Sequence, residues 1–201
     1  MGVMLALVTT VLLGTLGGGL VALSNTEAAI AANFRAGAEA LYAAEAGAEH
    51  VVHELQQSAA WSDWLSGAAG STLTDGTLTP TLPSSRVVSL VSMTSELQAE
   101  SDAFAQWGPN NPRWRLAAHA PVSQFVAGGS GASTYVAVWV ADDPSEIDGD
   151  VGRDANGVVM LRARALGRGV ASRSVELIVA RSATSGAGVT GVRILSWRVV
   201  R

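Results

Sequence analysis

The sequence predicts an α+β protein in which a long N-terminal helix packs through its second half on an antiparallel β-sheet. Three observations lead to this prediction. The first 26 residues carry no charge. Residues 26–57 contain no Pro and are rich in strong helix formers. Beyond them, short runs of apolar residues read as strands, two with clear alternation. We therefore expect three parts: residues 1–25, 26–57 and 58–201.

Composition excludes several classes of function. The 201 residues carry a net charge of −4, and the 13 basic residues form no run, so no nucleic-acid partner is expected. The absence of Cys excludes thiol catalysis, cysteine metal clusters and disulfides. Since the sequence also lacks a nucleophile elbow, a phosphate loop and a dinucleotide fingerprint, we do not expect an enzyme.

Residues 3–23 are predicted to span a membrane. As a helix these 21 residues extend about 32 Å, close to the roughly 30 Å hydrocarbon core of a bilayer. A signal peptide would begin with basic residues, and a buried helix of a soluble domain would carry a polar stripe; neither feature is present. A stem that packs against other subunits remains an alternative, because such a stem needs the same apolar surface.

Gly14, Gly17, Gly18 and Gly19 interrupt this apolar stretch. Each interior Gly costs a helix roughly 1 kcal/mol relative to Ala, and Gly14 with Gly18 forms a small-xxx-small pair that permits close helix approach. Two interpretations remain open. These are ordinary glycines of a membrane helix, or they mark a segment that packs tightly or partly melts when the helix moves from lipid into an assembly.

The helix is expected to continue through residue 57, placing Ile30, Phe34, Leu41, Val52 and Leu55 near one side. Residues 3–57 would then form a helix of about 80 Å. Because one molecule cannot bury such a helix, we expect lipid or neighbouring copies around its first half. A folded domain should pack along its second half.

Residues 2–55 resemble the N-terminus of type IV pilus minor pilins of the PilX type. The matching features are an apolar helix after a Gly, then Glu27, Asn33, Arg35 and residues 42–47 (YAAEAG). The resemblance implies a type IV pilin-like version of the α+β fold. It also implies cleavage by prepilin peptidase after Gly2 and methylation of Val3. It also implies an inner-membrane stage with a periplasmic globular domain, followed by an extracellular stage in a fibre whose core is a bundle of such helices.

Two positions depart from the family pattern. Only Met1 precedes Gly2, whereas family leaders end in basic residues, so the chain is expected to begin near the processing point. Leu7 stands at the fifth mature position, where most pilins carry a glutamate. A subunit without that carboxylate cannot neutralise the amino terminus of a neighbour, so we expect it at an end of the fibre.

Beyond the helix, residues 61–85 are rich in Gly, Ser, Thr and Pro and are predicted to form a loop. Trp61 and Trp64 are expected to seal the domain against the helix in preference to binding a ligand. Six strands are then predicted, forming a sheet with one solvent-facing side on which Arg162 and Arg164 lie. They cover residues 86–93, 114–120, 134–141, 158–165, 174–180 and 192–200.

The loop at residues 142–157 holds six carboxylates and one Asn. Asp148, Asp150, Asp154 and Asn156 have a spacing that could curl around one Ca²⁺ ion, although the closing Glu of an EF-hand is missing. A solvated acidic loop without an ion is the alternative. No other cofactor is expected.

The remaining candidates are weaker. His50 and His53 lack the His-Glu-x-x-His order of a zinc protease and are expected to lie on a wet helix face, while His119 is expected to be structural. Residues 128–133 (GGSGAS) are expected to be a flexible loop, because no helix follows them as in a phosphate site.

Two classes of function follow from the sequence. The first is a minor pilin that joins other minor pilins and the major pilin through its N-terminal helix, helps to start the fibre, and sits at or near its tip with an adhesin as a further candidate partner. The second is a membrane-anchored periplasmic binding or sensor domain. A tip pseudopilin of type II secretion is a relative of the first, although it usually has a larger inserted helical domain.

Overall fold

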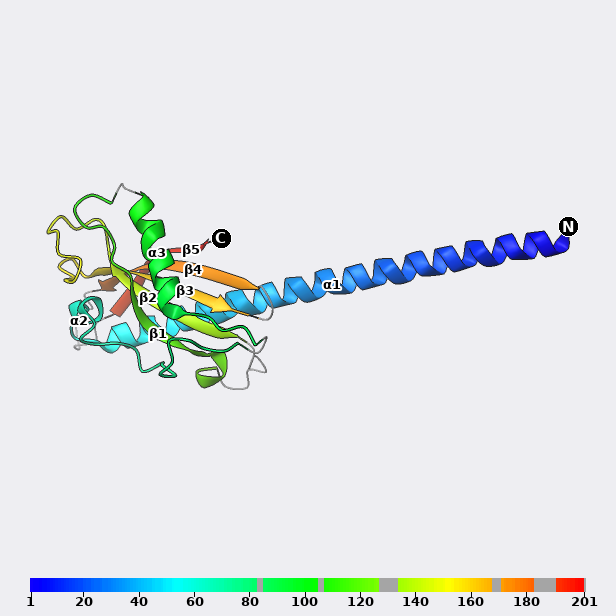
Figure 1. Ribbon diagram of the computed structural model, residues 1–201. Helices are drawn as coiled ribbons and strands as arrows, with labels where there is room; N and C mark the ends of the chain where they lie inside the picture. The colour runs from blue at the N-terminus through cyan, green and yellow to red at the C-terminus, as the bar shows by residue number, and fades with distance from the viewer. Residues whose placement is uncertain (83–84, 105–106, 127–133, 168–170, 183–190, 201) are drawn as a thin grey trace. The chain divides into compact units, whose positions relative to one another are not determined.

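The computed structural model describes residues 1–82, 85–104, 107–126, 134–167, 171–182 and 191–200 (Figure 1). The chain divides into two compact units, Met1–Ala36 and Gly37–Arg201. Helix α1 (Gly2–Gln57) begins in the first unit and ends in the second. The two units are described separately below.

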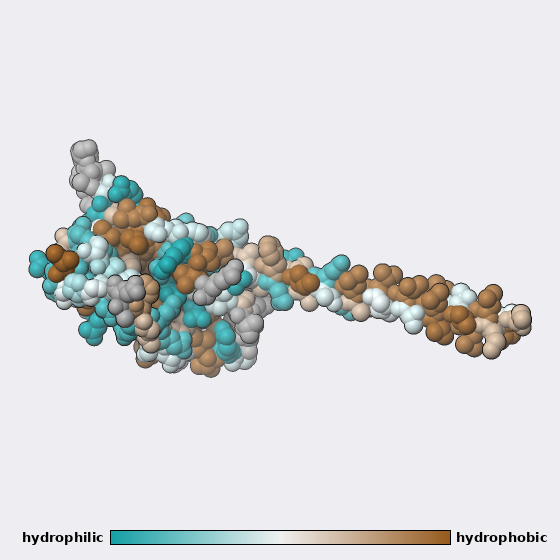
Figure 2. Space-filling view, turned by 90° about the horizontal axis from the view of Figure 1, so that it is seen from above, coloured by the Kyte–Doolittle hydropathy of each residue, from teal (hydrophilic) through white to brown (hydrophobic). Residues whose placement is uncertain are grey.

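The first unit is helical and exposes its apolar side chains, which Figure 2 shows in brown along the helix. An 18-residue window in α1 has a mean hydropathy of 2.0 with none of it buried. Thr9 and Thr10 donate their hydroxyl hydrogens to the carbonyls of Leu5 and Ala6, both at 2.8 Å. The hydroxyls of Thr9 and Thr10 are thus satisfied within the helix, as polar groups in a hydrocarbon environment must be. Among the described helices, α1 is the one long and apolar enough to cross a membrane.

The second unit is built on a five-stranded antiparallel sheet in which neighbours in sequence are neighbours in space, in the order β1-β2-β3-β4-β5. Five of the six predicted strands are confirmed. They are β1 (Arg115–Pro121), β2 (Tyr135–Asp142), β3 (Val158–Leu166), β4 (Ser172–Ser182) and β5 (Gly191–Val200).

The sixth predicted strand, residues 86–93, was wrong, because its second half belongs to helix α3 (Leu90–Phe104). Leu90, Met93 and Leu97 recur at helical spacing and are buried on one side. The Oγ of Ser89 accepts a hydrogen bond from the backbone N–H of Ser92 at 3.1 Å and so caps the helix start. A short helix, α2 (Ser62–Ser66), also lies within the region predicted to be a loop.

Helix α3 also overturns the expectation of a sheet with one wet face. All eight residues of β2 are buried. On one face, Val136, Val138 and Val140 pack in the cluster that contains α1 residues; on the other, Tyr135 and Trp139 pack with α3 residues. The sheet is therefore covered on both sides along β2. Arg162 and Arg164 do share a face of β3 and remain partly exposed.

The α1 surface that packs on the sheet is made mainly of Gly and Ala, not of the large residues predicted. Leu55 is buried as expected, but Ile30 and Phe34 are exposed, and Leu41 and Val52 are only partly buried. Small residues let the helix approach the sheet closely. The buried residues of α1 are Gly37, Ala40, Ala43, Ala44, Gly47, Ala48, Val51 and Leu55.

Trp61 and Trp64 fill the space after the end of α1, as predicted. Both are buried, and the indole Nε1 of Trp61 donates to the carbonyl of Leu55 at 2.9 Å. The indole Nε1 of Trp64 donates to the Oγ of Ser58 at 3.2 Å. These bonds tie the chain after the helix back to its last turn.

Candidate functional site

The first candidate region is the start of α1. Gly2 and Val3, the residues between which processing was predicted, lie at the beginning of this helix. The helix is continuous through Gly14, Gly17, Gly18 and Gly19, and no atom lies within 4 Å of a Cβ built at any of the four. The surface around these glycines is therefore open to lipid or to another helix, and their special role in packing stays a prediction.

Leu7 lies on the same exposed surface. The first carboxylate along the chain is Glu27, so residues 1–26 contain no charged side chain. This part of the helix therefore offers no carboxylate to any group packed against it.

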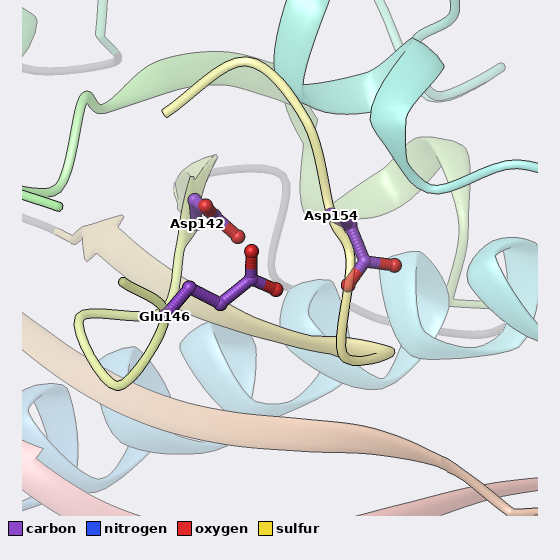
Figure 3. Close-up of side chains that lie close together, drawn as sticks. All are labelled: Asp142, Glu146 and Asp154. Atoms are coloured by element: carbon purple, nitrogen blue, oxygen red, sulfur yellow. The ribbon is translucent and has the colours of Figure 1, made fainter. Parts of the chain in front are cut away.

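The second candidate region is an acidic cluster in the connection between β2 and β3. Asp142 ends β2, and Glu146 and Asp154 follow in the connection. One carboxylate oxygen from each of the three lies within 4.8 Å of the others, and Figure 3 shows the three side chains gathered around one space. Asp142 is only 1% exposed and Glu146 only 6%.

Backbone hydrogen bonds hold two of these carboxylates in place. Glu146 Oε1 accepts from the N–H groups of Ala155 and Asn156 at 2.9 and 2.8 Å. Asp154 Oδ1 accepts from the N–H groups of Gly157 and Val158 at 2.7 and 3.2 Å. The connection thus folds back on itself and brings Asp154 toward Glu146.

A side-chain hydrogen bond holds the third carboxylate. Asp142 Oδ2 accepts from Nδ2 of Asn110 at 2.9 Å, and Asn110 itself is buried. The other oxygen of Asp142, Oδ1, is buried without a hydrogen-bond partner, as is Oε2 of Glu146. Two carboxylates therefore each keep one oxygen that nothing in the described protein satisfies.

The cluster also disfavours negative charge on its members. Burial, together with the nearby Glu146 carboxylate, raises the pKa of Asp142 to about 7. Burial likewise raises the pKa of Asp154, against the effect of the bond from Gly157. The arrangement concentrates carboxylates that solvent stabilises poorly.

Of the four residues predicted to bind calcium, the structure places only Asp154 in the cluster. Asp148 and Asp150 are exposed, and their Oδ1 atoms accept from the N–H groups of Asp150 and Gly152 at 3.1 and 3.2 Å. Asn156 Nδ2 donates to Asp143 Oδ2 at 2.6 Å. These three residues shape the turns of the loop.

Sequence reasoning missed Asp142 and Glu146 as members of the set. Burial of Asp142 could have been predicted, because this residue directly follows the apolar run of β2. The last residue of a strand that is buried on both faces is itself buried. No pattern marked Glu146, because it is buried beside Ile147, which is 88% exposed.

His53 is exposed and His119 is buried, as expected, but His50 is only partly exposed, with its Nε2 buried and its ring beside Phe125. His50 Nε2 lies 3.5 Å from Glu54 Oε1, and His53 pairs with Gln57; neither belongs to a metal-compatible group among the described residues. His119 is buried, with Nδ1 3.0 Å from the Tyr135 hydroxyl and Nε2 3.1 Å from Thr74 Oγ1. It links a loop to the sheet. The predicted loop at residues 128–133 lies outside the described residues.

Comparisons of the chain with protein-family models, with curated proteins and with solved structures gave no match. The function is therefore argued from the residues of the chain.

Proposed function

We propose that this chain is a minor pilin of a type IV pilus, a structural and interaction subunit without enzymatic activity. In this proposal it is held in the inner membrane with its globular part in the periplasm, then enters the fibre and becomes extracellular. It helps to initiate assembly and sits at or near the tip, where it can carry an adhesin.

One observation carries the proposal: α1 combines an apolar stretch, of which nothing is buried, with later turns that pack in a folded domain. Exposing that much apolar surface to water is unfavourable, at about 25 cal/mol per Å². The stretch therefore needs lipid or other helices around it. A subunit that moves from a membrane into a helix bundle meets the need in both stages.

Three further features support the proposal. The resemblance of residues 2–55 to minor pilins of the PilX type supplies the family expectation. Leu7 in place of the usual glutamate favours an end position over repeated positions in the shaft. Strand β5 exposes apolar side chains that neighbouring subunits of a fibre would cover. These side chains, between 43% and 48% exposed, are Ile194, Leu195, Trp197 and Val199.

The test is the location and the amino terminus of the native protein. We expect it in fibres sheared from the cell surface, with a mature chain that begins at N-methylated Val3, as mass spectrometry would show. Gly2→Val, which alters the residue before the processed bond, should leave an unprocessed chain in the inner membrane. A wild-type chain that is found only in membranes and is never processed would contradict the proposal.

The main alternative is a membrane-anchored periplasmic binding or sensor domain. An open groove beside α3 favours it, since apolar and polar side chains line that groove together, among them Val91, Gln98, Trp114 and Leu116. A tip pseudopilin of a type II secretion system is the other alternative. Both predict a protein absent from surface pili, so the fractionation experiment separates them from the proposal.

A further inference from the structure

We propose that Asp142, Glu146 and Asp154 bind a Ca²⁺ ion that fastens the connection between β2 and β3. This inference concerns the second unit alone and does not depend on the proposed pilus function. The proposed ligands differ from the set expected from the sequence, with which they share only Asp154.

The spacing of the three carboxylates fits one ion. Ca²⁺ binds oxygen ligands at about 2.3–2.6 Å, so two ligands on opposite sides of the ion lie roughly 5 Å apart. One carboxylate oxygen from each of the three residues lies within 4.8 Å of the others, and the side chains converge from β2 and from two points of the connection (Figure 3). An ion at their centre would be within reach of all three.

The unpaired oxygens are an independent observation that points to a ligand. Asp142 Oδ1 and Glu146 Oε2 are buried without any hydrogen-bond partner, in side chains that are 1% and 6% exposed. A buried acceptor left unsatisfied is costly, more so when it is charged. Oδ1 of Asn110, whose amide already contacts Asp142, is a further buried oxygen without a partner. A cation in the cluster would satisfy such oxygens directly.

No cation of the described protein takes this place. Within the described ranges, no Arg or His nitrogen lies within 4.0 Å of these three carboxylates. Burial raises the pKa of Asp154 and Arg181 offsets only part of that rise. The Arg181 guanidinium stacks 4.7 Å over the Trp61 ring and donates to the Ala59 carbonyl at 3.0 Å. The negative charge of the group is thus left for an external ion.

The donor set selects among divalent ions. All the converging donors are carboxylate oxygens, whereas Zn²⁺ sites in proteins rely mainly on His and Cys. Mg²⁺ requires a compact octahedron at about 2.0–2.1 Å and retains several waters. Three carboxylates on an irregular connection suit the larger Ca²⁺ ion, which accepts variable geometry.

The ion would act on the structure through Asp154. The backbone N–H of Asp154 donates to Ser62 Oγ at 3.1 Å, so this residue also contacts the first residue of α2. Binding would therefore fix the connection against the end of β2 and beside α2. We expect the bound protein to melt at a higher temperature by mass action.

The experiment uses the full chain in detergent, stripped of metals with EDTA and then titrated with CaCl₂ by calorimetry. We expect saturable binding to one site. Glu146→Gln should weaken it about tenfold or more by removing one ligand charge. This variant should fold, because the amide oxygen of Gln can still accept from Ala155 and Asn156. Asp142→Asn is a second variant with the same expectation.

Matched controls come from the same loop. Asp148→Asn and Asp150→Asn remove exposed carboxylates outside the cluster and should leave the dissociation constant unchanged within about twofold. The proposal is overturned if the wild-type chain neither binds Ca²⁺ nor melts at a higher temperature with it. It is also overturned if only the control variants abolish binding, or if MgCl₂ binds as tightly as CaCl₂.

Discussion

Gly47 determines how closely α1 approaches the sheet. It is buried against β2, and a Cβ built on it would overlap Val136 Cγ1 and lie 3.4 Å from Val138 Cγ2. Both valines are buried and branched at Cβ, so neither can swing away. A single hydrogen in place of a methyl group therefore permits the contact between helix and sheet.

We predict that Gly47→Ala lowers the free energy of unfolding. Overpacking a close contact costs about 1–3 kcal/mol, which should exceed the gain of up to about 1 kcal/mol in helix propensity. Gly37→Ala is the control, since its nearest neighbour is the flexible guanidinium of Arg173 at 3.0 Å. It should be neutral or slightly stabilising in urea unfolding followed by Trp fluorescence. Equal effects of the two substitutions would contradict the close approach at Gly47.

Glu54 joins α1 to the loop after α2. Its Oε1 accepts from the backbone N–H of Thr72 at 2.8 Å and from the hydroxyl of the same residue. Burial raises the pKa of Glu54, but hydrogen bonds from Ser71 and Thr72 and the nearby His50 outweigh burial, so the pKa lies below its ordinary value of 4.5. The ionised carboxylate is therefore bound more favourably in the folded protein than in the unfolded chain.

This shift predicts a pH dependence of stability. A lowered pKa stabilises the fold fully above the unfolded value of 4.5, and the contribution is lost as the pH falls through the lower folded value. Glu54→Gln should cost about 1 kcal/mol at pH 7. The difference between variant and wild type should shrink as the pH falls below 4.5 in urea unfolding. A difference that stays constant from pH 7 to pH 3 would show that ionisation of Glu54 is not involved.

Helix α3 covers the second face of the sheet at β2, where Tyr135 and Trp139 pack with its residues. Leu90 is fully buried on it, whereas the neighbouring Val91 is 58% exposed. We predict that Leu90→Ala costs about 2–5 kcal/mol, as a cavity in a packed core does. Val91→Ala should change stability by no more than about 0.5 kcal/mol. Thermal unfolding of both variants measures the contrast, and a large effect of Val91→Ala would contradict this orientation of the helix.

The elements differ in how far the sequence could predict them. Strands β2 and β3 were predictable because their apolar residues alternate or continue without a break. Five of the six predicted strands are present in the structure. The run at residues 86–93 was ambiguous, because a short apolar segment reads as a strand until Leu97 extends the helical spacing. The acidic cluster depended on how the connection folds back through Glu146, which is a tertiary contact that spacing along the loop cannot supply.

At the scale of the whole molecule, we predict that the two units differ in their solubility in water. The packed residues of α1 begin at Gly37, and residues 1–35 are exposed. The full chain should partition into detergent, while a chain shortened to begin at Glu27 should be soluble and folded, with the same far-UV circular dichroism of its sheet. A shortened chain that aggregates while the full chain dissolves without detergent would contradict the membrane anchor.

Under the proposed pilus function, Leu7 is predicted to determine the position of the subunit in the fibre. Burying a protonated amino terminus without a partner costs several kcal/mol in a dry helix bundle. A subunit is therefore disfavoured next to a neighbour that lacks the carboxylate to pair with its amino terminus. The chain can offer its own amino terminus to the glutamate of one neighbour but has no carboxylate at Leu7 for another. It should therefore occupy an end of the assembly, in few copies per fibre.

Quantitative mass spectrometry of sheared fibres measures that copy number. We expect far fewer copies than of the most abundant pilin, and deletion of the chain should reduce the number of fibres more than it alters those that remain. Leu7→Glu supplies the missing carboxylate and should raise the copy number by admitting the subunit to the shaft, whereas Leu7→Gln, which is close in size but uncharged, should not. A wild-type copy number that rivals the major pilin would refute the end position, because repeated incorporation would then leave a buried amino terminus unpaired at every copy.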